Sequence, residues 1–344
     1  MIEEYSKFII KAVEKFNLNI KDKLVLTEAA TGNYVCTPVI AAVAGAEVIA
    51  FTKNSKFGSV KDVIEQTNVL AEKMNVKSRI KIITDINETA FERIDIITNT
   101  GHLRPINRKL LSKVRLDTVI PLMYEPWEFR KGEIDLDYCR NRGILVCGTN
   151  ESDPRLRTMD YLGFIVLYLL LKERRTPFIT RVLITGTEKF TFPIKRILES
   201  TSYKAEIKKF EELENDFSGA DVLVVADHDD GRKVLSEKEP AILRNSQISN
   251  KKLVIHICGN VDFNDAAFKH YPDNPSPFGF MSFTTDYIDP IAVIDLHTAG
   301  LKVAEGMIQA RTENRIGLEY KNFMEKGYPA LTFPNNCIGK KLFS

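Results

Sequence analysis

The chain has 344 residues, of which 44% are hydrophobic and 27% are charged, and its 48 basic and 46 acidic residues leave a formal net charge of +2. This charge balance excludes a general electrostatic attraction to nucleic acid or to an anionic membrane. We therefore expect neither a nucleic-acid partner nor a membrane partner. The chain is longer than a usual domain with a single hydrophobic core, so two domains are expected.

The sequence carries no signal for export or membrane insertion. It begins Met1-Ile-Glu-Glu and lacks the basic start and apolar core of a signal peptide. The longest apolar run, residues 162–171, has about half the length needed to cross a bilayer. Five scattered cysteines without CxxC spacing are typical of reduced thiols. We therefore predict a cytoplasmic protein.

The first half of the chain alternates buried strands with helical patterns. The expected helices are 6–16, 38–44 and 60–74, and the expected strands are 23–30, 47–51, 80–83, 94–98, 118–123 and 144–147. Such alternation is typical of a parallel sheet with crossover helices.

A second unit of the same kind follows a strongly apolar helix expected over residues 160–174. Its expected strands are 181–185, 204–208, 221–226 and 253–257, with a helix over 192–198. The predicted fold class is therefore α/β, with two Rossmann-like parallel-sheet domains and an interdomain cleft. The predicted domains are 1–155 plus 297–344, and 156–296.

A buried strand rich in β-branched residues is expected over residues 291–297, followed at once by a helix. His297 would then lie at the end of a strand, which is where open α/β sheets bind ligands. A histidine there can exchange protons near neutral pH. The alternative is a structural histidine that caps the helix or satisfies a carbonyl group.

Two further loops carry candidate groups. His102 and Arg104 follow one expected strand, and Glu125 and Glu128 follow the next. Arg104 could clamp a carboxylate or phosphate, while His102 or Glu125 could transfer a proton. The alternative is a structural ion pair between Arg104 and Glu125 or Glu128. The run 227–230, Asp-His-Asp-Asp, is interpreted as a solvated acidic loop, so no metal site is predicted.

Residues 133–146, Glu-Ile-Asp-Leu-Asp-Tyr-Cys-Arg-Asn-Arg-Gly-Ile-Leu-Val, resemble a passage of the D-2-hydroxyacid dehydrogenase superfamily, which includes formate and glycerate dehydrogenases. The segment His297-Thr-Ala-Gly300 resembles the segment that carries the catalytic histidine of that family. The first unit, with Thr37-Pro38 and residues 45–48, is also similar in layout to S-adenosylhomocysteine hydrolases. The resemblance implies a substrate-type first domain, a nucleotide-binding second domain, NAD or NADP as cofactor, and His297 as the acid/base.

The cofactor residues implied by the resemblance are Gly186, Thr187, Cys258 and Gly259, but this part of the chain departs from the family pattern. One glycine, Gly186, stands where the family has three, and Glu188 adds a negative charge near the expected pyrophosphate. Cys258 replaces the substrate-binding arginine of the family. The acidic partner of His297 has two candidates nearby in the sequence, Asp286 and Asp289.

The leading functional hypothesis is a dehydrogenase-like enzyme acting on a small polar or anionic metabolite, with NAD or NADP. The alternative is a non-redox metabolite-binding protein, or an enzyme on the same scaffold that has lost the nicotinamide site. The sequence leaves open whether the chain is an enzyme. The expected partners are a small-molecule substrate and a second copy of the chain in a homodimer.

Overall fold

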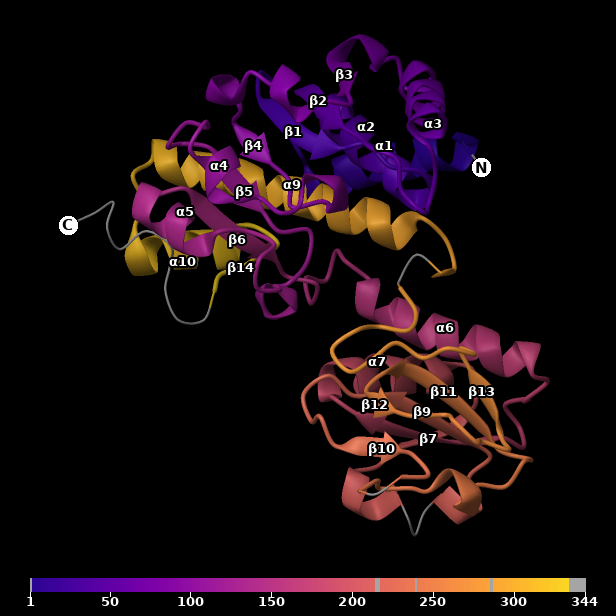
Figure 1. Cartoon of the computed structure of the whole chain (residues 1–344). Coiled ribbons are helices and arrows are strands. Elements are labelled where there is room, and N and C mark those ends of the chain that lie inside the picture. The colour runs from indigo at the N-terminus through magenta and orange to yellow at the C-terminus, as the bar shows by residue number, and fades with distance from the viewer. Residues whose placement is uncertain (1, 214–216, 239, 285–286, 334–344) are drawn as a thin grey trace. The chain divides into compact units, whose positions relative to one another are not determined.

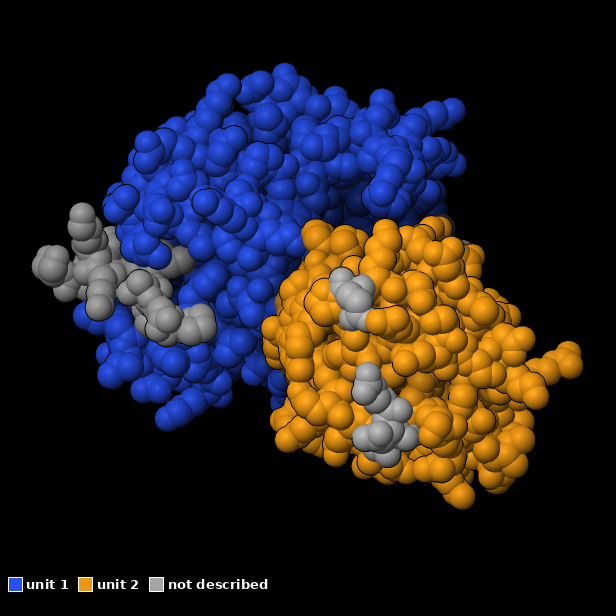
Figure 2. Space-filling model, turned by 60° about the horizontal axis from the view of Figure 1, so that its bottom comes forward, with its two compact units in different colours: residues 1–156, 290–344 blue, residues 157–289 orange. Residues whose placement is uncertain are grey.

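The computed structural model describes residues 2–213, 217–238, 240–284 and 287–333. The chain forms two units, unit 1 from Met1–Leu156 with Pro290–Ser344, and unit 2 from Arg157–Asp289. They are coloured blue and orange in Figure 2. None of the described helices combines the length and the apolar character needed to span a bilayer.

Unit 1 is built on a seven-stranded sheet in the order β14-β6-β5-β4-β1-β2-β3. Six strands are parallel and only β14 runs antiparallel, against β6. The strand bounds are β1 Leu24–Glu28, β2 Glu47–Phe51, β3 Ile80–Ile83, β4 Ile96–Ile97, β5 Val119–Pro121, β6 Leu145–Thr149 and β14 Ala330–Leu331. The predicted parallel sheet is confirmed, and the chain order of its strands reverses between β1 and β4.

Consecutive strand residues of unit 1 point into two different hydrophobic clusters, as a side-chain period of two requires. Val25 of β1 packs in one cluster and Leu26 in the other. The first cluster is covered by α1 Ile2–Phe16, α2 Cys36–Val43, α3 Val60–Lys73 and α9 Ile291–Thr312, and the second by α4 Arg108–Leu111 and α5 Leu136–Arg142. The last helix, α10 Gly317–Gly327, also packs in the first cluster. Buried apolar side chains on both faces explain the nearly continuous hydrophobic strands.

Unit 2 contains a five-stranded parallel sheet in the order β13-β11-β9-β7-β8. Its strands are β7 Arg181–Gly186, β8 Lys204–Ile207, β9 Val222–Ala226, β11 Leu253–Cys258 and β13 Lys269–Tyr271. A small two-stranded sheet joins β10 Lys233–Leu235 to β12 Asn260–Val261. The helices α6 Thr158–Lys172 and α7 Glu188–Ser200 cover one face of the main sheet.

The strand predicted over residues 291–297 is wrong, because this stretch forms the first two turns of α9. This helix belongs to unit 1 and crosses one face of its sheet beside α1 and α2 (Figure 1). Side chains are buried all around α9, so the stretch shows no polar face. A short apolar run of this kind cannot be told from a buried strand by its periodicity.

A glycine allows α6 and α7 of unit 2 to approach each other closely. A Cβ atom at Gly163 would lie 2.6 Å from the Cβ atom of Ile197 on α7. That distance is far below van der Waals contact, so a larger residue must push the two helices apart.

We expect Gly163→Ala to lower the free energy of unfolding by about 1–3 kcal/mol, the usual cost of overpacking a core. The same change at Gly327 in α10 is the control, because no atom lies within 4 Å of its added Cβ atom. Denaturant unfolding of both variants tests this. Equal stability of Gly163→Ala and Gly327→Ala would contradict the close helix approach.

Candidate functional site

The sheet of unit 1 reverses its chain order at β1, which has β2 on one side and β4 on the other. The connections after β1 and β4 therefore lead to opposite sides of this point, and sheets of this kind bind ligands in the crevice outside the carboxyl ends of these strands. The residues that follow the two strands are 29–35 and 98–104. They make up the candidate site, together with the side chains that reach them.

Glu28, the last residue of β1, binds the end of this strand to the loop that follows β4. Its carboxylate, 6% exposed, accepts a 2.7 Å hydrogen bond from the backbone N–H of His102. The backbone N–H of Glu28 in turn donates to the hydroxyl of Thr100, at 3.2 Å. A Cβ atom at Gly101 would lie 3.2 Å from the same carboxylate. The edge of the crevice is therefore a fixed structure with little room for larger residues.

His297 reaches this edge from α9 rather than from the end of a strand. Its Nδ1 atom lies 2.7 Å from the hydroxyl oxygen of Thr37 in α2, and its ring centroid is 5.8 Å from that of Tyr34. Burial lowers the pKa of His297 to about 4, so the imidazole is neutral near pH 7. Because a hydroxyl both donates and accepts, the contact orients the ring with either nitrogen protonated.

The two acidic residues predicted as partners of His297 stay without an observed contact to its ring among the described hydrogen bonds. Asp289 accepts hydrogen bonds from the hydroxyl of Tyr161, at 2.9 and 3.1 Å, within unit 2. Asp286 lies outside the described residues. The neutral hydroxyl of Thr37 stands where a carboxylate was expected.

The structure corrects the predicted partners of Arg104 and Glu125. The guanidinium of Arg104 pairs with Glu133, at 2.5 Å, and not with Glu125 or Glu128. Glu125 is buried and accepts hydrogen bonds from Trp127 Nε1, at 2.6 Å, and from the backbone N–H of Glu151, at 2.9 Å. Glu125 therefore joins the loop after β5 to the loop after β6.

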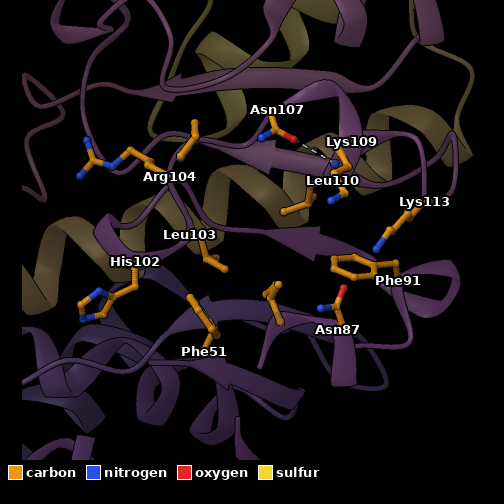
Figure 3. A pocket seen from close by; sticks show the side chains of 12 residues that line it. Phe51, Asn87, Phe91, His102, Leu103, Arg104, Asn107, Lys109, Leu110 and Lys113 are labelled. Carbon is orange, nitrogen blue, oxygen red and sulfur yellow. Dashed lines mark hydrogen bonds between the residues drawn. The ribbon is translucent and has the colours of Figure 1, made fainter. Parts of the chain in front are cut away.

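A cavity of about 280 Å³ lies beside the crevice, at the ends of β2, β3 and β4. Figure 3 shows His102 and Arg104 at one end and Lys113 next to Phe91 at the other, with the Arg104 guanidinium directed away from the rest. Its lining includes four basic side chains and no acidic one, and consists of Phe51, Ile86, Asn87, Phe91, His102, Leu103, Arg104, Pro105, Asn107, Lys109, Leu110 and Lys113.

The sequence patterns indicated His102 and Arg104 but not Lys109 and Lys113. The one available signal was the spacing of the two lysines, four residues apart and directly after the His102 loop, which places them on the same face of a helical turn. The same spacing is common on solvated helix surfaces, so it does not by itself indicate a site.

In unit 2 the structure brings Gly186, Thr187, Cys258 and Gly259 together at the carboxyl ends of β7 and β11, on either side of β9. Gly186 has φ 129°, and a Cβ atom there would lie 2.2 Å from the carbonyl oxygen of Ala226. Gly259 has φ 131° and packs against Val225. Both glycines are thus required by the packing of the strand ends, whatever the site binds. Cys258 is buried, and burial raises the pKa of its thiol.

The turn after β7 does not fit a pyrophosphate held in the manner of a three-glycine turn. The backbone N–H of Thr187 already donates to Ala226, at 3.0 Å, and its hydroxyl accepts from the backbone N–H of His228, at 2.9 Å. Asp227, 2% exposed, lies 3.4 Å from the same hydroxyl. Its Oδ2 atom is buried and has no hydrogen-bond partner among the described residues, and burial raises the pKa of the carboxyl group. A second anion placed there would meet this carboxylate.

Part of the acidic loop 227–230 is already engaged in an ion pair. Asp230 pairs with Arg232, at 2.6 Å. Across the described residues, no three His, Cys, Asp or Glu side chains are grouped so as to hold a metal ion. Four cysteines are free and buried, namely Cys36, Cys139, Cys147 and Cys258, whereas Cys337 lies outside the described residues.

No protein-family model matches the sequence, and no curated protein matches it significantly in sequence. Solved structures do match. A dipicolinate synthase chain from Bacillus halodurans is similar with a TM-score of 0.53 at 10% identity, over 85% of this chain and 98% of that chain. A dipicolinate synthase chain from Bacillus subtilis gives a TM-score of 0.52 at 11% identity, over 86% and 98%.

A D-lactate dehydrogenase from Treponema pallidum also matches, with a TM-score of 0.49 at 9% identity, over 83% of this chain and 97% of that chain. The first two matches, together with the two parallel sheets, confirm the predicted fold class of two Rossmann-like domains. At sequence identities this low, the similarity to these structures is a similarity of fold.

Two buried histidines make stability depend on pH. Burial lowers the pKa of His297 and of His256 from 6.5 to about 4. Between pH 4 and pH 6.5 the unfolded chain binds more protons than the folded chain does. The stability that the two neutral histidines contribute is therefore complete above pH 6.5 and is lost as the pH falls toward 4. We expect each histidine to account for about 2 kcal/mol of the loss between pH 7 and pH 4.5.

Denaturant unfolding at the two pH values checks this for the native chain, His297→Gln and His256→Gln. Each variant should lose less stability on acidification than the native chain does. An identical loss in all three would show that neither imidazole is held in its neutral form.

Proposed function

We propose that the protein is a dehydrogenase-like enzyme that acts on a small anionic metabolite at the carboxyl edge of the unit 1 sheet. The observation that carries the proposal is the position of His297, which α9 brings against Thr37 in the helix that follows β1. This is the edge at which the strand order reverses and Glu28 binds the end of β1 to the loop after β4. A group capable of proton transfer therefore lies at the point where the fold favours ligand binding.

Because His297 is buried, its pKa would depend on the charge of a ligand bound beside it. Burial disfavours the imidazolium, and a negative charge nearby favours it. A bound anion that faces the ring would therefore raise the pKa of His297 and make proton acceptance from the substrate favourable. In this proposal the imidazole accepts the proton and the hydroxyl of Thr37 orients the ring.

A second candidate function is favoured by Asp227 in unit 2. Hydride transfer in a dehydrogenase of this kind needs NAD or NADP, and the turn around Thr187 and Asp227 does not fit their pyrophosphate. The second candidate is therefore a non-redox enzyme or metabolite-binding protein on the same scaffold. The two candidates share the site in unit 1 and differ only in nucleotide binding.

Calorimetric titration with NAD, NADH, NADP and NADPH separates these candidates. Micromolar binding of any one would support the dehydrogenase, and absence of binding at millimolar nucleotide would leave the second candidate. Asp227→Asn is the informative variant, because it removes the charge with little change of shape. If the carboxylate is what opposes pyrophosphate, this variant binds nucleotide more tightly than the native chain.

We expect His297→Gln to lower turnover by at least about a hundredfold, the usual contribution of a general acid or base, with little change in melting temperature at pH 7. Turnover would be followed with a substrate found by screening small anionic metabolites. Thr37→Val should shift the pH dependence of turnover, whereas Thr37→Ser keeps the hydroxyl and should retain the native profile. A large drop in melting temperature for His297→Gln with retained turnover would mark a structural histidine.

A further inference from the structure

We infer that the cavity of unit 1 binds an organic dianion with a flat apolar body, of the class of an aromatic phosphomonoester or dicarboxylate. This inference rests on the proposed function only in taking such a ligand as the substrate. The expected binding rests on the charge, the aromatic floor and the size of the cavity.

The cavity has an excess of positive charge that its own lining does not neutralise. Arg104 is paired with Glu133, so its charge is largely compensated. Lys109 and Lys113 remain, and among the described residues neither has a carboxylate within ion-pair distance. His102 adds an imidazole at the opposite end (Figure 3). Two unpaired ammonium groups around one cavity repel each other, and a ligand with two negative charges relieves that repulsion.

The floor of the cavity is aromatic and apolar. Phe91 is 5% exposed, and the Lys113 ammonium lies 5.0 Å from the centroid of its ring. Phe51, Ile86 and Leu103 complete the floor. A flat apolar body can therefore lie on this floor while its anionic group meets the ammonium at the rim.

Asn107 in the cavity lining can also donate to an anion. The side-chain oxygen of Asn107 accepts from the backbone N–H of Leu110, at 3.1 Å, which leaves its amide N–H groups for a ligand. The volume of about 280 Å³ is at the small end of ligand pockets, which indicates a metabolite rather than a dinucleotide.

Calorimetry of the full chain with three aromatic probes tests the inference. Phenyl phosphate and phthalate carry the two candidate dianionic groups, and benzyl alcohol is the uncharged control. We expect at least one dianion to bind at least about tenfold more tightly than benzyl alcohol, with an affinity that falls as salt is added. The tighter of the two dianions identifies the class of the anionic group.

The double variant Lys109→Gln, Lys113→Gln should weaken dianion binding at least about tenfold. Lys61→Gln is the matched control, since Lys61 is an exposed lysine of α3, which packs in the other hydrophobic cluster of unit 1. Unchanged affinity in the double variant would overturn the inference. So would benzyl alcohol binding as tightly as the dianions, or no dianion binding at about 10 mM.

The proposed function and this inference fail in different ways. His297→Gln should keep dianion binding while it loses turnover. Turnover of an anionic substrate that persists in the double lysine variant would overturn the cavity assignment alone. Normal dianion binding together with full turnover in His297→Gln would overturn the proposed function and leave the cavity assignment intact.

Discussion

The reversal of strand order between β1 and β4 is the constraint on which the site of unit 1 depends. Parallel strands place all their carboxyl ends at one edge, so the loops after β1 and β4 meet there although they lie some seventy residues apart in the chain. Glu28 fixes the end of β1 to the loop after β4, α9 brings His297 to the helix after β1, and the basic cavity opens beside them. In our proposals, this one edge of one sheet therefore carries both the proton acceptor, His297, and the anion-binding cavity.

Unit 2 also has a parallel sheet, but the residues at its strand ends have different roles from those of unit 1. Gly186 and Gly259 are needed for backbone packing, and Thr187 engages its N–H and its hydroxyl within the protein. Asp227 then adds a buried carboxylate at the same edge. The two units thus share a fold class but differ in charge at their strand ends, which is basic in unit 1 and acidic in unit 2. The difference lies in the loops and not in the sheets.

Sequence patterns predicted the parallel strands well because apolar side chains on both faces leave a strong local signal. They failed at residues 291–297, where a fully buried helix has the same apolar, β-branched composition as a buried strand. The partner of Arg104 was missed because Glu133 is distant in sequence and pairs only through the fold. Lys109 and Lys113 look like any solvated lysines in the sequence, and only the fold places Phe91 beneath Lys113 and both lysines at one cavity.

The most direct test of the central claim is to follow the ring resonances of the five histidines by NMR while phenyl phosphate is added. His102 and His297 belong to unit 1, and the other three belong to unit 2, namely His228, His256 and His270. Ligand binding at the carboxyl edge of the unit 1 sheet predicts that the His102 resonances shift and those of unit 2 stay in place. Shifts confined to the histidines of unit 2 would contradict it.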